Sequence, residues 1–144
     1  MAAPQFAHPE LPNNLRFDFD PVNKILLIRV DGRITDTLLA QIYQVGRRYS
    51  LATDAKVAIV DFSSVTEFLI SAQLISRLAH QEPAMPHAAE RPRFIVAPQT
   101  HAFGLFRMFQ LMGEPRRPLL QVVHTLDEAF AALGVQSPHF EPLA

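Results

Sequence analysis

Apolar residues recur along this chain with two periods, one typical of strands and one typical of helices. Short apolar or alternating runs predict strands, whereas apolar residues three and four positions apart predict amphipathic helices. We expect strands at residues 15–19, 25–30, 57–62, 94–97 and 119–123. We expect helices at residues 35–49, 71–80, 100–112 and 125–133.

Turn and capping residues mark where these elements begin and end. Residues 20–23 form an Asp-Pro-Val-Asn turn that joins the first two strands in a hairpin, and Gly32 is expected to close the second strand. Thr35 is a suitable N-cap for the first helix, and Gly134 is a suitable stop for the last one. The order ββαβαβαβα predicts an α/β fold, because strands that alternate with helices form parallel crossovers. We expect one domain with a mixed β-sheet of about five strands and about four packed helices.

Both ends of the chain and one internal segment are rich in proline. Residues 1–13 contain three prolines and little periodicity, so we expect a loose N-terminal arm. Residues 136–144 are expected to form a Pro-rich C-terminal tail, which leaves the domain itself at residues 14–135. Three further prolines make residues 82–92 a loop.

Length, charge and cysteine content indicate which cellular compartment and which classes of partner to expect. The chain has 144 residues, no cysteine, a formal net charge of −1 and a sequence pI of about 6.6. This charge does not favour electrostatic binding of nucleic acid or of an anionic membrane. The N-terminus lacks a signal-peptide pattern, and no apolar run approaches the roughly 18 residues of a membrane helix. We therefore expect a cytoplasmic protein that binds neither nucleic acid nor membrane.

The usual signatures of cofactor, metal and catalytic sites are missing from the sequence. The five glycines form neither a G-x-G-x-x-G pattern nor a P-loop. The six histidines are scattered without metal-ligand spacing, and no G-x-S-x-G elbow is present. Without cysteine, thiolate catalysis and cysteine-based zinc sites are excluded. We expect no metal, no cofactor and no enzymatic activity.

The segment from residue 56 to residue 78 carries the main functional prediction. A buried strand ends near Asp61, a short polar loop follows, and a helix opens at Ser71. In α/β folds, ligands and partners bind at this carboxyl edge of the sheet. A phospho-accepting role for Asp61 would need an acidic pair and a lysine that the sequence does not supply, so Asp61 is expected to accept backbone hydrogen bonds in its own loop. The predicted partner-binding loop consists of Asp61, Ser63, Ser64, Thr66 and Glu67.

Ser71 has two alternative roles. As a plain N-cap, its side chain would stabilise the helix by about 1 kcal/mol. As a phosphorylation site, it would place a phosphate at a helix N-terminus, where free N–H groups and the helix dipole favour negative charge. Both roles stay open at the level of the sequence.

The helix at residues 100–112 is apolar on more than one face. A helix with one face on a sheet needs about half of its residues apolar, so some of Phe103, Phe106 and Met108 are expected to face outward. Such a patch indicates a partner or self-association surface, unless the loop at residues 82–92 or the C-terminal tail covers it. The predicted interface patch consists of Phe103, Phe106, Arg107, Met108 and Phe109.

Two short motifs resemble a known family. Residues 61–66 read Asp-Phe-Ser-Ser-Val-Thr, and residues 69–72 read Leu-Ile-Ser-Ala. The chain resembles the STAS domain of bacterial anti-sigma factor antagonists over roughly residues 15–134. That family has an Asp-Leu-Ser-like strand end and then Asp-Ser-Ser-Gly opening a helix, so Ser71 lies on the serine that an anti-sigma kinase phosphorylates. Leu69, Ile70 and Ala72 depart from the family motif.

The resemblance implies a non-catalytic protein–protein interaction module of a bacterial regulatory system, with a degenerate phosphorylation loop. Its partner would be an anti-sigma factor or a kinase-like protein. The alternative is a homodimerising or small apolar-ligand-binding STAS-like domain that uses the helix patch and has no phosphorylation switch.

Overall fold

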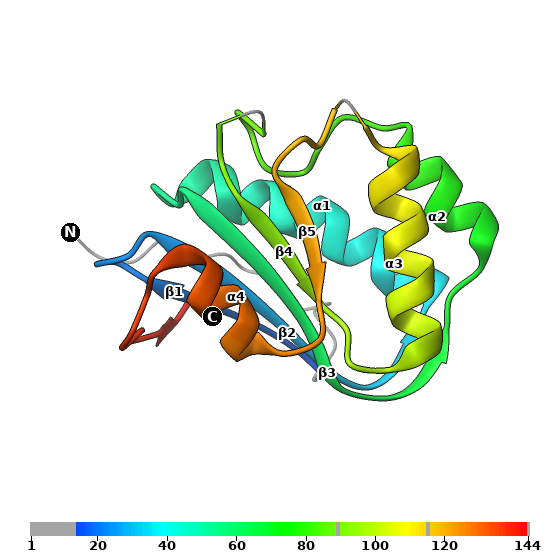
Figure 1. The fold of residues 1–144 in the computed structure, drawn as a ribbon, viewed down its shortest axis with the longest axis horizontal. Helices are drawn as coiled ribbons and strands as arrows, with labels where there is room; N and C mark the ends of the chain where they lie inside the picture. Colours follow the sequence, from blue (N-terminus) through cyan, green and yellow to red (C-terminus); the bar gives the residue numbers. More distant parts are fainter. Residues whose placement is uncertain (1–13, 89, 115, 144) are drawn as a thin grey trace.

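A computed structural model describes residues 14–88, 90–114 and 116–143 (Figure 1). The expected N-terminal arm at residues 1–13 lies outside the described residues. The described residues form six strands and four helices. In chain order these are β1 (Leu15–Asp20), β2 (Ile25–Thr35), α1 (Asp36–Ala52), β3 (Val57–Leu69), α2 (Ala72–Ala79), β4 (Arg93–Val96), α3 (Thr100–Met112), β5 (Leu120–Val123), α4 (Leu126–Leu133) and β6 (Glu141–Pro142).

The sheet is mixed, as the order of elements predicted. Its strands lie in the order β5-β4-β3-β2-β1-β6. The pairs β2–β3, β3–β4 and β4–β5 are parallel, because each is joined by a helical crossover. The β1–β2 pair is the expected antiparallel hairpin. The mixed α/β architecture with four helices is therefore confirmed.

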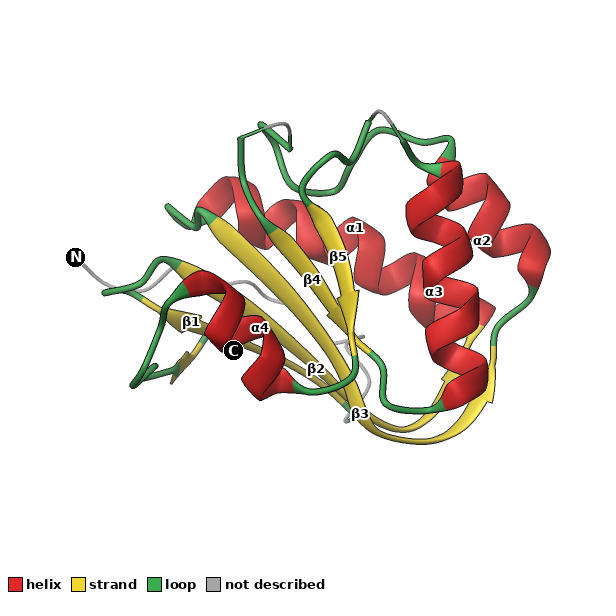
Figure 2. Cartoon of the chain, viewed as in Figure 1, coloured by secondary structure: helices red, strands yellow, loops and turns green. Residues whose placement is uncertain are grey.

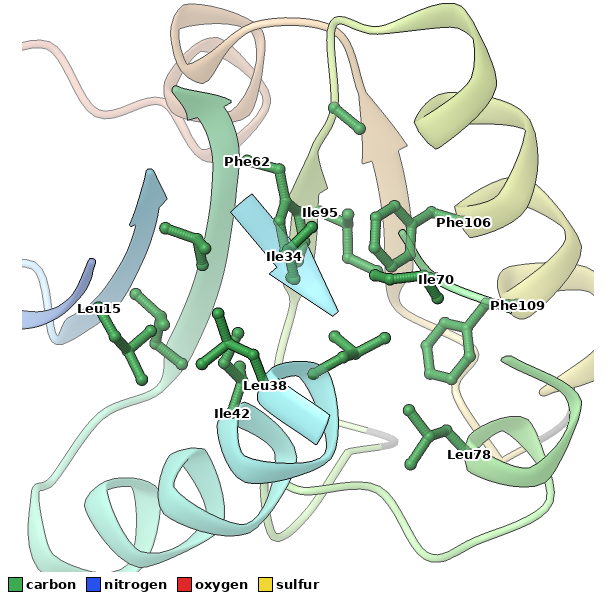
Figure 3. Close-up of a cluster of buried hydrophobic side chains, with 14 of the residues drawn as sticks. Leu15, Ile34, Leu38, Ile42, Phe62, Ile70, Leu78, Ile95, Phe106 and Phe109 are labelled. Carbon is green, nitrogen blue, oxygen red and sulfur yellow. The ribbon is translucent and has the colours of Figure 1, made fainter. Parts of the chain in front are cut away.

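Helices cover both faces of this sheet (Figure 2). Side chains alternate along each strand, so Val60 and Phe62 face α1, α2 and α3, whereas Ile59 faces α4. The larger core lies under α1–α3, and Figure 3 shows part of it. The smaller core lies under α4 around Ala129.

The predicted caps at Thr35 and Ser71 and the predicted stop at Gly134 are present, and Thr125 caps α4 in the same way. The side chains of Thr35, Ser71 and Thr125 each accept a backbone hydrogen bond at a helix N-terminus. Gly134 ends α4 in the left-handed conformation with φ of 70°.

Two strands extend further than the sequence pattern indicated. β2 does not close at Gly32 but continues to Thr35, and β3 runs through the expected loop to Leu69. The two extensions pair in parallel, with register shifts on both sides of Asp31 and Gly32. The polar composition of residues 63–67 suggested a loop, but pairing with β2 satisfies their backbone groups in an extended conformation.

The C-terminal segment adds a sixth strand that the sequence pattern did not indicate. Glu141 and Pro142 pair with Phe19 and Asp18 of β1, and Leu143 is buried in the larger core. A two-residue strand has no hydrophobic period, so only its pairing with β1 identifies it.

Candidate partner-binding surface

The long β2–β3 pair leads to the beginnings of two helices. Figure 1 shows the two strands curving together past the shorter strands toward α1 and α2. β2 ends at Thr35, immediately before α1, and β3 ends at Leu69, two residues before the N-cap of α2. This carboxyl edge contains the predicted partner-binding loop and Ser71.

Ser71 is bound at both its hydroxyl and its amide. Its Oγ accepts a hydrogen bond from the amide of Leu74 at 3.2 Å, which is the N-cap contact. The same hydroxyl donates to Asp36 Oδ2 at 2.6 Å, and the Ser71 amide donates to Asp36 Oδ1 at 2.8 Å. Asp36 is the first residue of α1, so its carboxylate joins the N-termini of α1 and α2.

Asp36 is held in its charged form by this arrangement. The Ser71 hydroxyl and amide keep the pKa of Asp36 below its ordinary value, and the charge of Arg77 acts in the same direction, against a smaller effect of burial. An acid in the first turn of a helix also suits the helix dipole. Its contact with Ser71 spans 35 residues, so no local pattern identifies it.

The predicted loop residues form an exposed polar ribbon along β3. Ser63, Ser64, Thr66 and Glu67 are exposed, and Glu67 pairs with Arg33 of β2 at 3.2 Å. Asp61 is partly buried and accepts hydrogen bonds from the amide and hydroxyl of Ser63. This is the local structural role that the sequence indicated for Asp61.

The two apolar departures from the family motif lie in different environments. Leu69 is 47% exposed beside Ser71, whereas Ile70 is 7% exposed and belongs to the larger core. Leu69 therefore changes the surface that a partner would contact, and Ile70 contributes to packing.

The predicted interface patch on α3 needs correction. Phe106 and Phe109 are only 3% and 9% exposed, so of the three residues expected to include outward-facing ones, Phe106 faces inward, and Phe109 is not part of a surface patch. Phe106 stacks on Phe62 of β3 with ring centroids 4.8 Å apart, and Phe109 packs in the same core. α3 packs against both the sheet and α2, so two faces of α3 are covered.

The other patch residues remain near the surface. Phe103 is half-buried and stacks on His124 with centroids 4.1 Å apart, and Met108 is half-buried against the core. Arg107 is exposed and donates to Gln110 at 2.8 Å. Of these three side chains, Arg107 alone is exposed, and it is charged.

Two further features of the described residues concern possible ligands and location. No group of three or more His, Cys, Asp or Glu side chains in the described part of the chain is arranged to hold a metal ion. Within the same residues, no helix combines the length and apolar character needed to cross a membrane.

Comparison with known proteins identifies the fold. No protein-family model matches the sequence, and no curated protein matches it either. Among solved structures, the chain is similar to the anti-sigma factor antagonist SpoIIAA in its unphosphorylated form, with 13% identity and a TM-score of 0.54 over 85% of this chain and 99% of that chain. The phosphorylated form of SpoIIAA, described as a Bacillus cell fate determinant, is 16% identical with a TM-score of 0.49 over 83% of this chain and 98% of that one. The chain therefore has the STAS fold, as found in the anti-sigma factor antagonist SpoIIAA.

Proposed function

We propose that this chain is a non-catalytic protein–protein interaction module that acts like an anti-sigma factor antagonist in a bacterial regulatory system. The observation that supports this proposal most is the exposed polar ribbon of β3, which leads directly to the Asp36–Ser71 contact at the carboxyl edge of the sheet. The likeness of the fold to an anti-sigma factor antagonist agrees with such a role. The partner would be an anti-sigma factor or a kinase-like protein.

The surroundings of Ser71 favour a degenerate phosphorylation loop. A phosphate on Ser71 would gain the backbone N–H groups of α2 but would lie against the Asp36 carboxylate, which now contacts the hydroxyl at 2.6 Å. Like charges at such a distance repel by about 1 kcal/mol in water and by several kcal/mol at a partly buried site. Phosphorylation would therefore have to break the contact between α1 and α2. We propose that the unmodified chain, with this contact intact, is the form that binds the partner.

Binding can be tested with the kinase-like anti-sigma proteins encoded in the same genome. Isothermal titration calorimetry with each purified protein would compare the native chain with Thr66→Arg, a change in the exposed ribbon. The matched control is Gln121→Arg, which places the same charge on an exposed position of β5. We expect Thr66→Arg to weaken binding about tenfold or more at an unchanged melting temperature.

The control should bind like the native chain, because β5 lies at the opposite side of the sheet from β1 and away from the ribbon. Failure of the native chain to bind any of these proteins would refute the proposed function. Equal losses in both variants would show that the ribbon is not the contact surface.

A further inference from the structure

An apolar cavity of about 120 Å³ lies between the sheet and the helices α1, α2 and α3. The sheet forms one side, and the other walls come from the three helices and from the loop before β4. They include Ile42 of α1, Leu78 of α2, Phe106 and Phe109 of α3, and Met85 of the loop. Figure 3 shows the two phenylalanines pointing from α3 into this region of the core. Because protein interiors are close-packed, a space much larger than a water molecule is uncommon in a core.

The central strand of the sheet shows the same gap in the packing. β3 lies between β2 and β4, and Val60 is flanked by Ile28 and Ile95, which are 4% and 7% exposed. Val60 faces the helices as these two neighbours do, yet it is only half-buried, and so is Ala58 two residues earlier. Both Val60 and Ala58 line the cavity. The helices therefore leave part of the inner face of β3 uncovered.

The cavity offers a ligand almost no polar surface. Arg117 lies at its wall, but the guanidinium donates to the carbonyls of Leu78 and Ala79 at 2.9 and 2.7 Å and to the hydroxyl of Tyr43 at 3.0 Å. Arg93 also lies at the wall, but its Nε and Nη2 have almost no accessible surface. A buried water molecule needs two to four polar partners, and apolar cavities stay dry. The cavity therefore suits an apolar molecule better than water or an anion.

The size and the walls of the cavity match a single aromatic ring. An engineered cavity of about 150 Å³ with Leu, Ile and Phe walls binds benzene or xenon. Phe62, Phe106 and Phe109 all line the cavity here, and the rings of Phe62 and Phe106 stack with centroids 4.8 Å apart. A further ring can pack against such side chains in an edge-to-face or offset manner. An empty cavity lowers stability in proportion to its volume, and an apolar ligand restores the missing contacts.

We propose that this cavity binds a neutral apolar molecule of the size of a single aromatic ring. Burial of apolar surface supplies the affinity, and the scarcity of accessible polar groups disfavours charged or strongly hydrogen-bonding ligands. The sequence suggested an apolar ligand on the outer face of the helix at residues 100–112, whereas this site lies beneath that helix, in the core. The site is separate from the exposed ribbon of β3 and does not depend on the proposed function.

Binding can be measured by isothermal titration calorimetry of the full chain with benzene and with toluene. Phenol and benzoate serve as probes of similar shape that carry a hydroxyl group or a charge. We expect saturable binding of benzene or toluene, and binding of phenol that is about 10- to 100-fold weaker, because its hydroxyl would lose hydrogen bonds to water. Benzoate should not bind. If neither hydrocarbon binds saturably, or if phenol or benzoate binds as tightly, the proposal is wrong.

A variant that fills the cavity locates the site. Ala58→Leu places a larger side chain on the uncovered inner face of β3. Ala131→Leu makes the same exchange at an exposed position of α4, which covers the other face of the sheet, and is the matched control. We expect Ala58→Leu to weaken benzene binding about tenfold or more and to melt at or above the temperature of the ligand-free native chain, because cavity filling restores contacts. The control should keep the native affinity.

A second variant and a direct readout cover the case in which Ala58→Leu does not fold. Ala84, on the loop before β4, also lines the cavity, so Ala84→Leu should fill it from another wall and weaken benzene binding in the same way. In the native chain, benzene should shift the NMR signals of the Val60 and Met85 methyl groups, which line the cavity, and leave those of Val135 under α4 unchanged. Native affinity in either folded variant, or unshifted Val60 and Met85 signals, would overturn the assignment.

Discussion

Ser71 and Asp36 illustrate how much one contact between distant residues adds to a local capping motif. The cap to Leu74 is local and follows from the sequence, whereas the bond to Asp36 depends on β2 and β3 ending side by side. The serine hydroxyl serves both contacts at once, accepting from an amide and donating to a carboxylate. At this scale the candidate site is a junction between two helix N-termini.

Replacement of Ser71 should lower the stability of the folded chain. We expect Ser71→Ala to lower the free energy of unfolding by about 0.5–2 kcal/mol through the lost cap, and more if the loss of the Asp36 contact adds to it. Ser71→Asp should retain the cap but place a second carboxylate beside Asp36, so it should be less stable than a cap exchange alone predicts. Urea denaturation at neutral pH measures both effects.

The pH dependence follows from the lowered pKa of Asp36. Because its pKa in the folded chain is below the ordinary 3.8, its contribution to stability is complete above that value and is lost as the pH falls through the folded pKa. Asp36→Asn should therefore differ most from the native chain above the ordinary pKa of 3.8, and should approach it only as the pH falls through the lower pKa of the folded chain. A stability difference that stays constant over this range would contradict the contact.

At the scale of elements, the extension of β2 and β3 depends on an irregular pairing around Gly32. Gly32 has φ of +69°, and the ladder shifts register on both sides of it. A β-bulge of this kind redirects the strands, and glycine adopts positive φ without steric cost. The extension carries the exposed ribbon to the N-termini of α1 and α2.

Gly32→Ala should lower the free energy of unfolding by about 1–2 kcal/mol. An added Cβ would meet no atom within 4 Å, so the cost comes from the backbone conformation alone. Gly104 is the matched control, since it also has open space around it but lies within α3. Gly104→Ala should instead stabilise the chain by about 1 kcal/mol through helix propensity. Chemical denaturation of both variants gives the comparison, and equal effects would contradict the argument.

At the scale of the whole molecule, the C-terminal segment returns to the first hairpin. β6 pairs with β1, and the carboxylate of Asp20 accepts a hydrogen bond from the amide of His139, 119 residues away, at 3.2 Å. Asp20 is fully buried; burial alone would raise its pKa, but hydrogen bonds from Asn23, His139 and Val22 outweigh that effect and lower it. The same carboxylate thus stabilises the β1–β2 turn and attaches the end of the chain.

Loss of the Asp20 carboxylate should affect the β1–β2 turn and the C-terminal segment together. We expect Asp20→Ala to lower the free energy of unfolding by about 2–3 kcal/mol, since the charge-assisted hydrogen bonds that the buried carboxylate accepts from Val22, Asn23 and His139 are lost. Hydrogen exchange should increase at the amides of Asn23 and His139 in the same variant. Asp18→Ala, on the same strand but only half-buried, serves as the control. Faster exchange at the turn alone would show that Asp20 does not attach the C-terminal segment.

The sequence by itself determined the order of helices and strands, the mixed α/β architecture and the helix caps, because apolar periodicity and capping chemistry act over a few residues. Helix α3 matches its predicted bounds for this reason. The tertiary structure alone decided the strand extensions, the sixth strand and the burial of Phe106 and Phe109, because each depends on a partner distant in the chain. The same holds for the contact of Asp36 with Ser71, since pairing between distant residues is a property of the packed molecule.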